Sequence, residues 1–523
     1  MRARKPSLAL RSMLSVLAIL ALFVAACSLG RGSVAAPTPT RANPDAARFQ
    51  QSACPFPLES GFHDGENVRC GALVVPEDRA NPTGTRISVA AAIFKTPAAN
   101  PAPDPIIFLQ GGPGGRLIED FAPLIMQRTL DLAHQFGNHD VILIDQRGTG
   151  YSRPSLQCDE VVQLEFLTNR DISVQQAVDE QNKALTACHD RLTKAGINLA
   201  AYTTASDAGD VHDLIAALGY KQVDLYGVSY GTRLALEIMR AYPGGIRSVV
   251  LDSTVPAQSH LLTSIPADIQ RVFGRLFAGC AADAACNAKY PGLESTLYAL
   301  VTRLNGQPVT FKTTDLNTNK TYTVVFKGDD LVNLLFQGFY AAQLIPLLPA
   351  MIAQANRGDF NHLVSLLYGA LVFDTSVSWG VYFSVECAED VSYATADAVD
   401  AAAQALPEPI REGQRISLEG EIPACKAWNV GRAPASEGQP VASDIPTLIL
   451  EGEYDPVTPP ANGDLAAQTL SHSYRYLFPA TGHAVLLFNP SDCPTTVALA
   501  FWTNPAAKPD GACIAAMGEP RFQ

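Results

Sequence analysis

Residues 227–235 read GVSYGTRLA, a serine framed by two glycines between an apolar, strand-like run and residues that favour a helix. A strand followed at once by a helix requires a sharp turn, and Gly227 and Gly231 let the backbone bend and pack closely there. Such a turn leaves the Ser229 hydroxyl exposed at a helix N-terminus, which favours negative charge developing nearby. The pattern also suits an ordinary turn serine, so the rest of the chain decides whether Ser229 is a nucleophile.

A serine hydroxyl is a weak nucleophile unless a histidine accepts its proton and an acid orients the histidine. For a serine on this kind of turn, the partners are expected in the chain order serine, acid, histidine. LILEGEYDPVTP places Asp455 directly after a late strand, and YRYLFPATGH places His483 in a loop after the next strand. Asp455 could instead cap the turn before Pro456, whereas His472 precedes its strand and would face away from the site. Ser229, Asp455 and His483 are therefore the predicted catalytic residues.

Stabilising an oxyanion requires two fixed N–H donors. The backbone N–H of Tyr230, directly after Ser229, is the first candidate. The glycine-rich loop QGGPGG at 110–115 supplies the second, and Gly112 is the predicted donor because Pro113 has no N–H. These glycines could instead cradle a phosphate, but no Lys-Ser/Thr pair follows them, as a phosphate-binding loop would require.

Around the serine motif, short apolar strands alternate with helical stretches. Apolar strands ending in glycine-rich loops are expected in 105–115 and 140–150, a helix over 206–220, and a further strand in 247–256. This alternation implies parallel pairing in an α/β sheet. Two earlier strand-like runs separated by NPTG predict an antiparallel start to the same sheet.

The alternation stops at about residue 257, where long helical segments such as DDLVNLLFQGFYAAQLIPLLPAMIAQA begin, and it returns after about residue 440. With 523 residues, the chain is long enough for a catalytic core and a second lobe. The sequence therefore predicts a core formed by residues 54–256 and 441–523, with a mostly helical cap inserted at 257–440.

The N-terminal residues 1–27 combine a basic beginning, an apolar run at 12–26 and small residues immediately before Cys27. The apolar run is shorter than the ~20 residues of a spanning helix, which favours a signal peptide. Its last residues, VAAC, resemble a bacterial lipobox, so we expect an exported protein anchored to the cell envelope by lipid on the cysteine. Plain secretion is the alternative. Residues 28–53, rich in Pro, Ala and Thr, are the predicted flexible tether.

The cysteine count supports export. The chain has 11 cysteines, and setting Cys27 aside leaves an even number. Disulfides between neighbours along the chain are the simplest arrangement in an oxidising compartment, although spacing alone leaves the connectivity open. The neighbours are Cys54 and Cys70, Cys158 and Cys188, Cys280 and Cys286, Cys387 and Cys425, and Cys493 and Cys513. No CxxC spacing and no Cys/His cluster occurs, so neither a metal nor a cofactor is predicted.

The formal net charge of −13 argues against nucleic acid and anionic lipid headgroups as partners, because both require clustered Lys and Arg. Contact with a membrane is therefore expected only through the lipid on Cys27. The sequence leaves the oligomeric state open.

Four motifs occur in a specific order: GGPGG, DQRGTGYS, GVSYGT, and the late GEYDPVTP followed by GH. Together they resemble the proline iminopeptidase and tripeptidyl aminopeptidase branch of the α/β-hydrolases. The chain is similar to exported tripeptidyl aminopeptidases of actinobacteria and to mycobacterial cell-envelope serine hydrolase lipoproteins, over nearly all of its mature length. The resemblance implies an α/β-hydrolase fold, with a mostly parallel central sheet, helices on both faces and a large, mostly helical inserted cap.

Carried over by motif, the resemblance implies catalytic roles for Ser229, Asp455 and His483, and oxyanion roles for Gly112 and Tyr230. One position departs from the family pattern: the glycine-rich loop usually begins with histidine in the iminopeptidases, and here it begins with Gln110. This change leaves the backbone donors intact but can alter the loop. Asp145 and Arg147, in DQRG, are expected to be structural and to position the adjacent loops.

The resemblance also implies cleavage from a free peptide N-terminus, which requires carboxylates that pair with the α-ammonium group. The inserted cap contains SVECAEDV, with Glu386, Glu389 and Asp390 close together around Cys387. Glu386 is the first choice, because an adjacent disulfide would hold it rigidly. The cluster could instead be a solvated face of an acidic protein. If two of these carboxylates lie close together without a cation, one should show a raised pKa.

Three functions follow from these observations. The leading hypothesis is an exported serine aminopeptidase that releases a short N-terminal peptide or a single residue through an acyl-enzyme on Ser229. The alternative is a carboxylesterase or lipase-like hydrolase of envelope esters, favoured if LLFQGFYAAQLIPLLP lines an apolar cleft. A non-catalytic binding protein on the same scaffold is the third, and it would be supported only by a buried Ser229.

Overall fold

The computed structural model describes residues 48–165, 171–314, 319–360, 364 and 376–523. The predicted signal peptide, its lipobox cysteine and most of the tether lie outside these residues. Within them, no helix is both long and apolar enough to cross a membrane.

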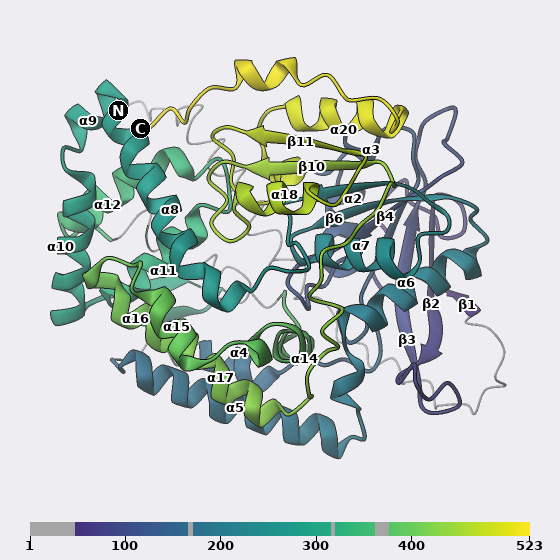
Figure 1. Ribbon diagram of the computed structural model, residues 1–523, viewed down its shortest axis with the longest axis horizontal. Coiled ribbons are helices and arrows are strands. Elements are labelled where there is room, and N and C mark those ends of the chain that lie inside the picture. The colour runs from purple at the N-terminus through teal and green to yellow at the C-terminus, as the bar shows by residue number, and fades with distance from the viewer. Residues whose placement is uncertain (1–47, 166–170, 315–318, 361–363, 365–375) are drawn as a thin grey trace, which may run out of the picture.

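A nine-stranded sheet forms the centre of the described structure, in the order β1-β2-β3-β5-β4-β6-β7-β10-β11 (Figure 1). The first three strands pair antiparallel, β3 pairs antiparallel with β5, and the neighbours from β5 to β11 pair parallel. This confirms the mostly parallel sheet and its antiparallel start. The strands are β1 (Arg48–Ser52), β2 (Val68–Pro76), β3 (Arg86–Phe94), β4 (Ile106–Leu109), β5 (Val141–Ile144), β6 (Val223–Val228), β7 (Ile246–Asp252), β10 (Thr447–Gly452) and β11 (Ser473–Phe478).

Strand β1 lies within residues 28–53, which the sequence assigns to a flexible tether. It pairs antiparallel with β2, from Arg48 opposite Val74 to Ser52 opposite Cys70. Its sequence RFQQS carries no apolar period because most of it is exposed. Backbone pairing and the half-buried Phe49, which packs against an apolar cluster of the core, place it at the edge of the sheet. The described fold therefore begins earlier than the expected boundary at residue 54.

Helices cover both faces of the sheet, as expected. On one face, apolar side chains of α6, α7 and α18 pack against the strands, and on the other those of α2, α3 and α20 do so. These helices are α2 (Ile118–Met126), α3 (Leu132–Phe136), α6 (Thr204–Leu218), α7 (Tyr230–Ala241), α18 (Pro460–Ala467) and α20 (Cys493–Thr503).

The segment between β7 and β10 forms a second lobe, drawn on the left of Figure 1. It is mostly helical, as expected, with one added hairpin, β8–β9. Its elements are α8 (Leu261–Ala282), α9 (Ala284–Lys289), α10 (Leu293–Gly306), β8 (Val309–Thr314), β9 (Thr321–Phe326), α11 (Gly328–Gly338), α12 (Leu348–Asn356), α14 (Trp379–Glu389), α15 (Ala396–Ala403), α16 (Glu408–Glu419) and α17 (Glu421–Trp428).

One helix that the sequence places in the core packs against the lobe instead. Helix α5 (Val174–Lys194) follows the short α4 (Asp159–Glu165) and lies beside α16 and α17 along the lower edge of Figure 1. Its buried residues Leu185, Cys188 and Leu192 share an apolar cluster with α14 and Trp428. The apolar period of α5 shows that the helix is amphipathic. It does not show which neighbouring element covers the apolar face.

Five disulfides join the described cysteines, and each pair is a pair of neighbours along the chain, which confirms the simplest arrangement. They are Cys54–Cys70, Cys158–Cys188, Cys280–Cys286, Cys387–Cys425 and Cys493–Cys513. The fourth links α14 to α17 within the lobe. It therefore holds α14, the helix that carries the predicted acidic cluster.

Candidate active site

Ser229 lies on the turn between β6 and α7, at φ 56° and ψ −127°. A positive φ is costly for a residue with a side chain and persists only where the surroundings enforce it. A Cβ on Gly231 would lie 2.0 Å from the Leu109 carbonyl oxygen, and one on Gly227 would lie 2.5 Å from the Gly231 carbonyl oxygen. Both glycines are therefore needed for this close approach. The turn leaves Ser229 partly accessible, which removes the one observation that would favour a non-catalytic scaffold.

Asp455 and His483 come together from the loops that follow β10 and β11. The distance from His483 Nδ1 to Asp455 Oδ2 is 2.8 Å, and Asp455 is fully buried. Asp455 also accepts hydrogen bonds from the Thr458 N–H, at 2.8 Å, and the Thr458 hydroxyl, at 2.7 Å. Burial alone would raise the pKa of Asp455, but the nearby His483 and these hydrogen bonds lower it below its usual value. The carboxylate therefore stays ionised and can accept Nδ1–H, which leaves Nε2 of His483 free to act as a base.

The lobe holds the other side of His483. The His483 N–H donates to the Tyr340 carbonyl at 3.0 Å, and the two rings lie 4.9 Å apart, centroid to centroid. Both Tyr340 and Thr458, which contact His483, line a cavity that Ser229 also lines. In the part of the chain that the structure describes, no hydrogen bond joins Ser229 to His483, and such a bond often tightens only when substrate binds.

Gly112 and Tyr230, the two predicted oxyanion donors, both line the same cavity. Tyr230 is the first residue of α7, so its N–H has no acceptor within the helix. In the preceding loop, the Gly111 N–H is bound by its neighbour Gln110, at 3.0 Å. Gln110 thus occupies the donor next to Gly112 and leaves the Gly112 N–H for a substrate oxygen. The departure from histidine at this position has a defined structural role.

Asp145 has the structural role expected for DQRG. Its carboxylate is fully buried and accepts hydrogen bonds from the N–H groups of Leu117, Ile118 and Tyr151, at 2.8, 2.9 and 2.7 Å. Burial raises the pKa of Asp145 to about 6, and these hydrogen bonds limit the rise. The residue therefore caps the start of α2 and fixes the end of the glycine-rich loop.

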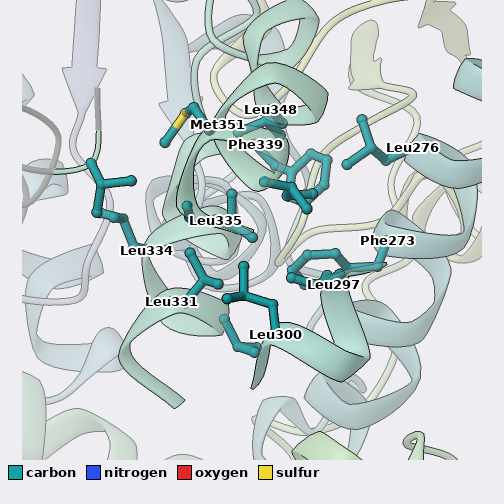
Figure 2. Packing of buried hydrophobic residues seen from close by; sticks show 14 of the residues in the cluster. Phe273, Leu276, Leu297, Leu300, Leu331, Leu334, Leu335, Phe339, Leu348 and Met351 are labelled. Carbon is teal, nitrogen blue, oxygen red and sulfur yellow. The ribbon is translucent and has the colours of Figure 1, made fainter. Parts of the chain in front are cut away.

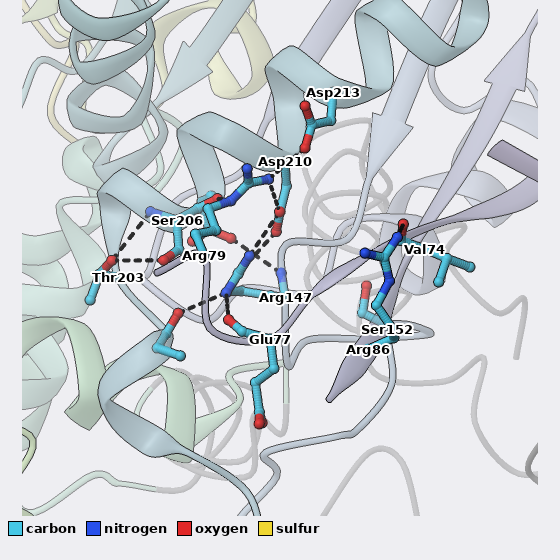
Figure 3. A network of polar contacts seen from close by, with 12 residues as sticks. Val74, Glu77, Arg79, Arg86, Arg147, Ser152, Thr203, Ser206, Asp210 and Asp213 are labelled. Carbon is cyan, nitrogen blue, oxygen red and sulfur yellow. Dashed lines mark hydrogen bonds and ion pairs between the residues drawn. The ribbon is translucent and has the colours of Figure 1, made fainter. Parts of the chain in front are cut away.

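Arg147, two residues further on, is also structural. It is fully buried, makes two hydrogen bonds to Asp210 at 2.9 and 2.8 Å, and donates to the carbonyls of Glu77 and Ala201 at 2.7 Å each. Figure 3 shows this network, in which Arg79 shares Asp210. Neither Asp145 nor Arg147 lines the cavity beside Ser229.

The three predicted acidic residues, Glu386, Glu389 and Asp390, line the cavity of about 80 Å³ beside Ser229. Glu389 and Asp390 are only 4% and 5% exposed and Glu386 is half-buried, so the cluster is not a solvated face. The carboxyl end of α14 thus lies against the candidate nucleophile. The sequence identified the cluster, but only packing across the lobe shows that it faces Ser229.

The three carboxylates differ in their partners. Glu389 is bound by the N–H and hydroxyl of Thr204, at 2.7 and 2.6 Å, and lies 3.5 Å from Arg233. Asp390 accepts the N–H of Leu262 at 3.0 Å, near the start of α8. No hydrogen bond or ion pair within the described structure engages the Glu386 carboxylate, which is therefore the acid available to a ligand.

Burial, and then the nearby Asp390, raise the pKa of Glu386 well above its usual value, and Arg233 only partly offsets this rise. Among the three carboxylates, this raised pKa falls on Glu386, the first-choice residue. A carboxyl group in this state gains most when a cation enters the cavity, because Glu386 has no ion-pair partner among the described residues and the cation supplies one.

The glycine-rich loop fixes the position of α14 relative to the cavity. The N–H of Ser378, directly before α14, donates to the Gly114 carbonyl at 2.8 Å, and Val377 pairs with Gly115. A Cβ on Gly114 would lie 2.6 Å from the Ser378 carbonyl oxygen. The helix therefore begins at the predicted oxyanion loop and ends at the acidic residues, so one element sets the distance between them.

The apolar stretch LLFQGFYAAQLIPLLP contributes mainly to the core of the lobe. Its leucines, with Phe339 and Met351, are buried in the core of the lobe (Figure 2). Of this stretch, only Tyr340 contributes to the cavity beside Ser229. The condition that would favour an esterase, an apolar cleft lined by this stretch, gains no support here, because its leucines pack inside the lobe.

Sequence reasoning missed several residues of this site. Tyr340 and Arg233 line the cavity. The hydroxyl of Thr204, which binds Glu389, also lies 2.8 Å from the Tyr230 hydroxyl. Thr458 has a local signal, since it lies in DPVTP three residues after Asp455. The others had none, because their roles arise from contacts between distant segments.

Two groups of side chains in the described structure have a spacing that a metal ion could use. In the first, Cys158 and Cys188 are joined in a disulfide. The second group consists of Asp104, His139 and Asp224. Arg247 is the charge partner of its two carboxylates and lies 2.7 Å from each of them. Both groups therefore have structural partners within the protein.

A family model described as the alpha/beta hydrolase fold matches residues 104–490. The chain belongs to this family, and its fold and site together define a serine hydrolase. It is similar to the serine protease Hip1 of Mycobacterium tuberculosis, with 25% identity over 468 residues that cover 85% of this chain and 86% of the relative. The tripeptidyl aminopeptidase of Streptomyces lividans is 29% identical over 195 residues, which are 36% of this chain and 35% of that protein.

The family resemblance inferred from the four motifs is confirmed by these comparisons. Among solved structures, a proline iminopeptidase from Mycobacterium smegmatis aligns with 83% of this chain and 98% of its own, with 15% identity and a TM-score of 0.36.

Proposed function

We propose that this protein is an exported serine aminopeptidase, with Ser229 as nucleophile, His483 as general base and acid, and Asp455 as the group that orients the histidine. The relatives named as a serine protease and as a tripeptidyl aminopeptidase support a peptidase. The five disulfides support an oxidising, extracytoplasmic location. In this proposal, lipid on Cys27 anchors the protein to the outer face of the membrane.

The proposed reaction follows from the positions of these groups. His483 Nε2 takes the proton of the Ser229 hydroxyl as Oγ attacks the scissile carbonyl carbon, and Asp455 stabilises the imidazolium that forms. The N–H groups of Gly112 and Tyr230 stabilise the negative oxygen of the tetrahedral intermediate. His483 then gives the proton to the leaving amine, and water hydrolyses the acyl-enzyme by the same steps in reverse order.

The observation that carries the proposal is the unpaired Glu386 carboxylate in the cavity beside Ser229. An acyl chain would gain nothing from a half-buried, unpaired carboxylate, whereas the α-ammonium group of a peptide would supply Glu386 with a direct charge partner. The distance from this carboxylate to Ser229 would then decide how many residues are released. The cavity of about 80 Å³ itself has room for the ammonium end of a substrate and little more.

Peptide p-nitroanilides of one, two and three residues, each with a free and an acetylated N-terminus, test the proposal. For the preferred length, kcat/KM should be about 100-fold higher for the free form, because acetylation leaves the half-buried Glu386 carboxylate without its charge partner. Glu386→Gln should remove most of this difference by weakening the free form alone. Steady-state kinetics of both forms on both proteins give the four values needed.

Glu408→Gln, at an exposed position on the same lobe, is the matched control and should keep the native preference for free N-termini. Equal turnover of free and acetylated peptides by the native enzyme would contradict the proposal. Rapid hydrolysis of a short-chain p-nitrophenyl ester together with no peptide cleavage would favour the alternative, a carboxylesterase of envelope esters.

The Michaelis constant for free peptides should depend on pH with a minimum. Because burial and Asp390 raise the pKa of Glu386, its carboxyl is neutral at low pH and binds an ammonium group weakly. As pH rises through this pKa, KM should fall, and it should rise again above about pH 8, where the peptide α-amino group loses its proton. Acetylated peptides should show no minimum. A KM for free peptides that stays constant from about pH 5 to about pH 9 would contradict the role of Glu386.

A further inference from the structure

Asp252 makes hydrogen bonds both to the backbone of Ser229 and to the backbone that follows His483. It is the last residue of β7, the strand beside β6, and it is fully buried. Its backbone carbonyl accepts the N–H of Ser229 at 3.0 Å. This hydrogen bond fixes the backbone of the strained turn that carries the nucleophile.

The Asp252 carboxylate holds the loop that follows His483. Oδ1 accepts the N–H of Val485 at 2.7 Å, and Oδ2 accepts the N–H of Leu486 at 2.9 Å. The hydroxyl of Tyr226, on β6, donates to Oδ2 at 2.9 Å. The adjacent Ser253 Oγ accepts the N–H of Ala484 at 2.8 Å. Three consecutive N–H groups after the histidine are therefore bound from the end of β7.

The carboxylate is held in its charged form by these donors. Burial raises the pKa of Asp252 to about 6, and the hydrogen bonds from Leu486, Tyr226 and Val485 limit the rise. The residue does not bind the His483 ring, because Nδ1 is bound by Asp455. Its contacts are with the backbone of Ser229, the backbone after His483 and the Tyr226 hydroxyl, so it acts on geometry.

We propose that Asp252 is a positioning residue that sets the approach of His483 to Ser229 by holding both of their backbone segments from one strand end. The inference rests on the proposed roles of Ser229 and His483, but not on the identity of the substrate. It applies equally to a peptidase and to an esterase.

Asp252→Asn tests this role, because the amide keeps the size of the side chain but presents a donor to groups that already donate. The rate constant for labelling of Ser229 by a fluorophosphonate should fall about 100-fold, as expected for a misplaced base. The kcat for a p-nitrophenyl ester should fall by a similar factor while KM is retained. Labelling carried to completion should still reach the native stoichiometry, which shows that the folded fraction is unchanged.

Asp224→Asn is the matched control. Asp224 is a buried carboxylate at the opposite end of β6, bound to Arg247 and Ser248. This variant should lower the melting temperature and retain the native labelling rate constant. A purely structural role for Asp252 predicts the same behaviour for both variants.

Tyr226→Phe is the second test and applies even if Asp252→Asn fails to fold, because it removes one donor to Oδ2 and keeps the apolar ring. It should lower the labelling rate constant and kcat in the same sense as Asp252→Asn, by a smaller factor, with KM retained. Native rates in both variants, or in Tyr226→Phe alone when Asp252→Asn is unfolded, would overturn the proposal. Loss of the preference for free N-termini in the native enzyme would overturn the aminopeptidase proposal and leave this one standing.

Discussion

Ser229→Ala is expected to lower kcat about 10⁶-fold and to abolish labelling by a fluorophosphonate, because the hydroxyl is the only group that can form the acyl-enzyme. Alanine occupies the same backbone conformation as serine, at φ 56°, so the variant should fold and melt like the native protein. Intact-mass spectrometry after probe treatment measures labelling, and p-nitroanilide turnover measures kcat.

Ser436→Ala, at an exposed serine, serves as the control and should label fully. Labelling of Ser229→Ala at another residue, or peptide turnover at the native rate, would show that Ser229 is not the nucleophile. Either result would also remove the basis for the roles proposed for Gly112 and Tyr230.

Asp455→Asn should lower kcat about 10⁴-fold with the fold intact, since an amide in this position can hold the histidine in the wrong tautomer. The amide can donate to Nδ1, which places the proton on Nε2 and leaves no base for the Ser229 hydroxyl.

The measurement is kcat for the preferred peptide, with thermal unfolding to show that the variant is folded. Asp464→Asn, at an exposed aspartate on α18 paired with Arg475, should keep the native kcat. If Asp455→Asn retained the native kcat, another group would have to orient His483 and the assignment would be wrong.

Much of the core was predictable because its determinants are local. The turn at Ser229 needs small residues on either side, and the glycines at positions 227 and 231 can be recognised in the sequence. The alternation of apolar strands and helices predicts parallel pairing, and the positions of Asp455 and His483 follow from their place after two late strands. Each of these inferences depends on residues within a few positions of one another.

The lobe was predictable only as a class of structure. Its helices could be expected from composition and spacing, but the same pattern did not show that the stretch around Phe339 fills the lobe core. Nor did it show that α5 joins the lobe. An amphipathic helix has one apolar face, and its sequence does not specify which partner covers that face.

What the sequence by itself determined is therefore the α/β-hydrolase fold, the order of the candidate catalytic residues and the existence of an acidic cluster near Cys387. What only the tertiary structure decided is that the cluster faces Ser229, that Glu386 is its unpaired member, and that Asp252 holds the segments on both sides of the site. The physical reason is that local spacing sets backbone turns and periodicity. The partner of a buried carboxylate is instead set by the packing of segments such as α14 and α7, which are far apart in the chain.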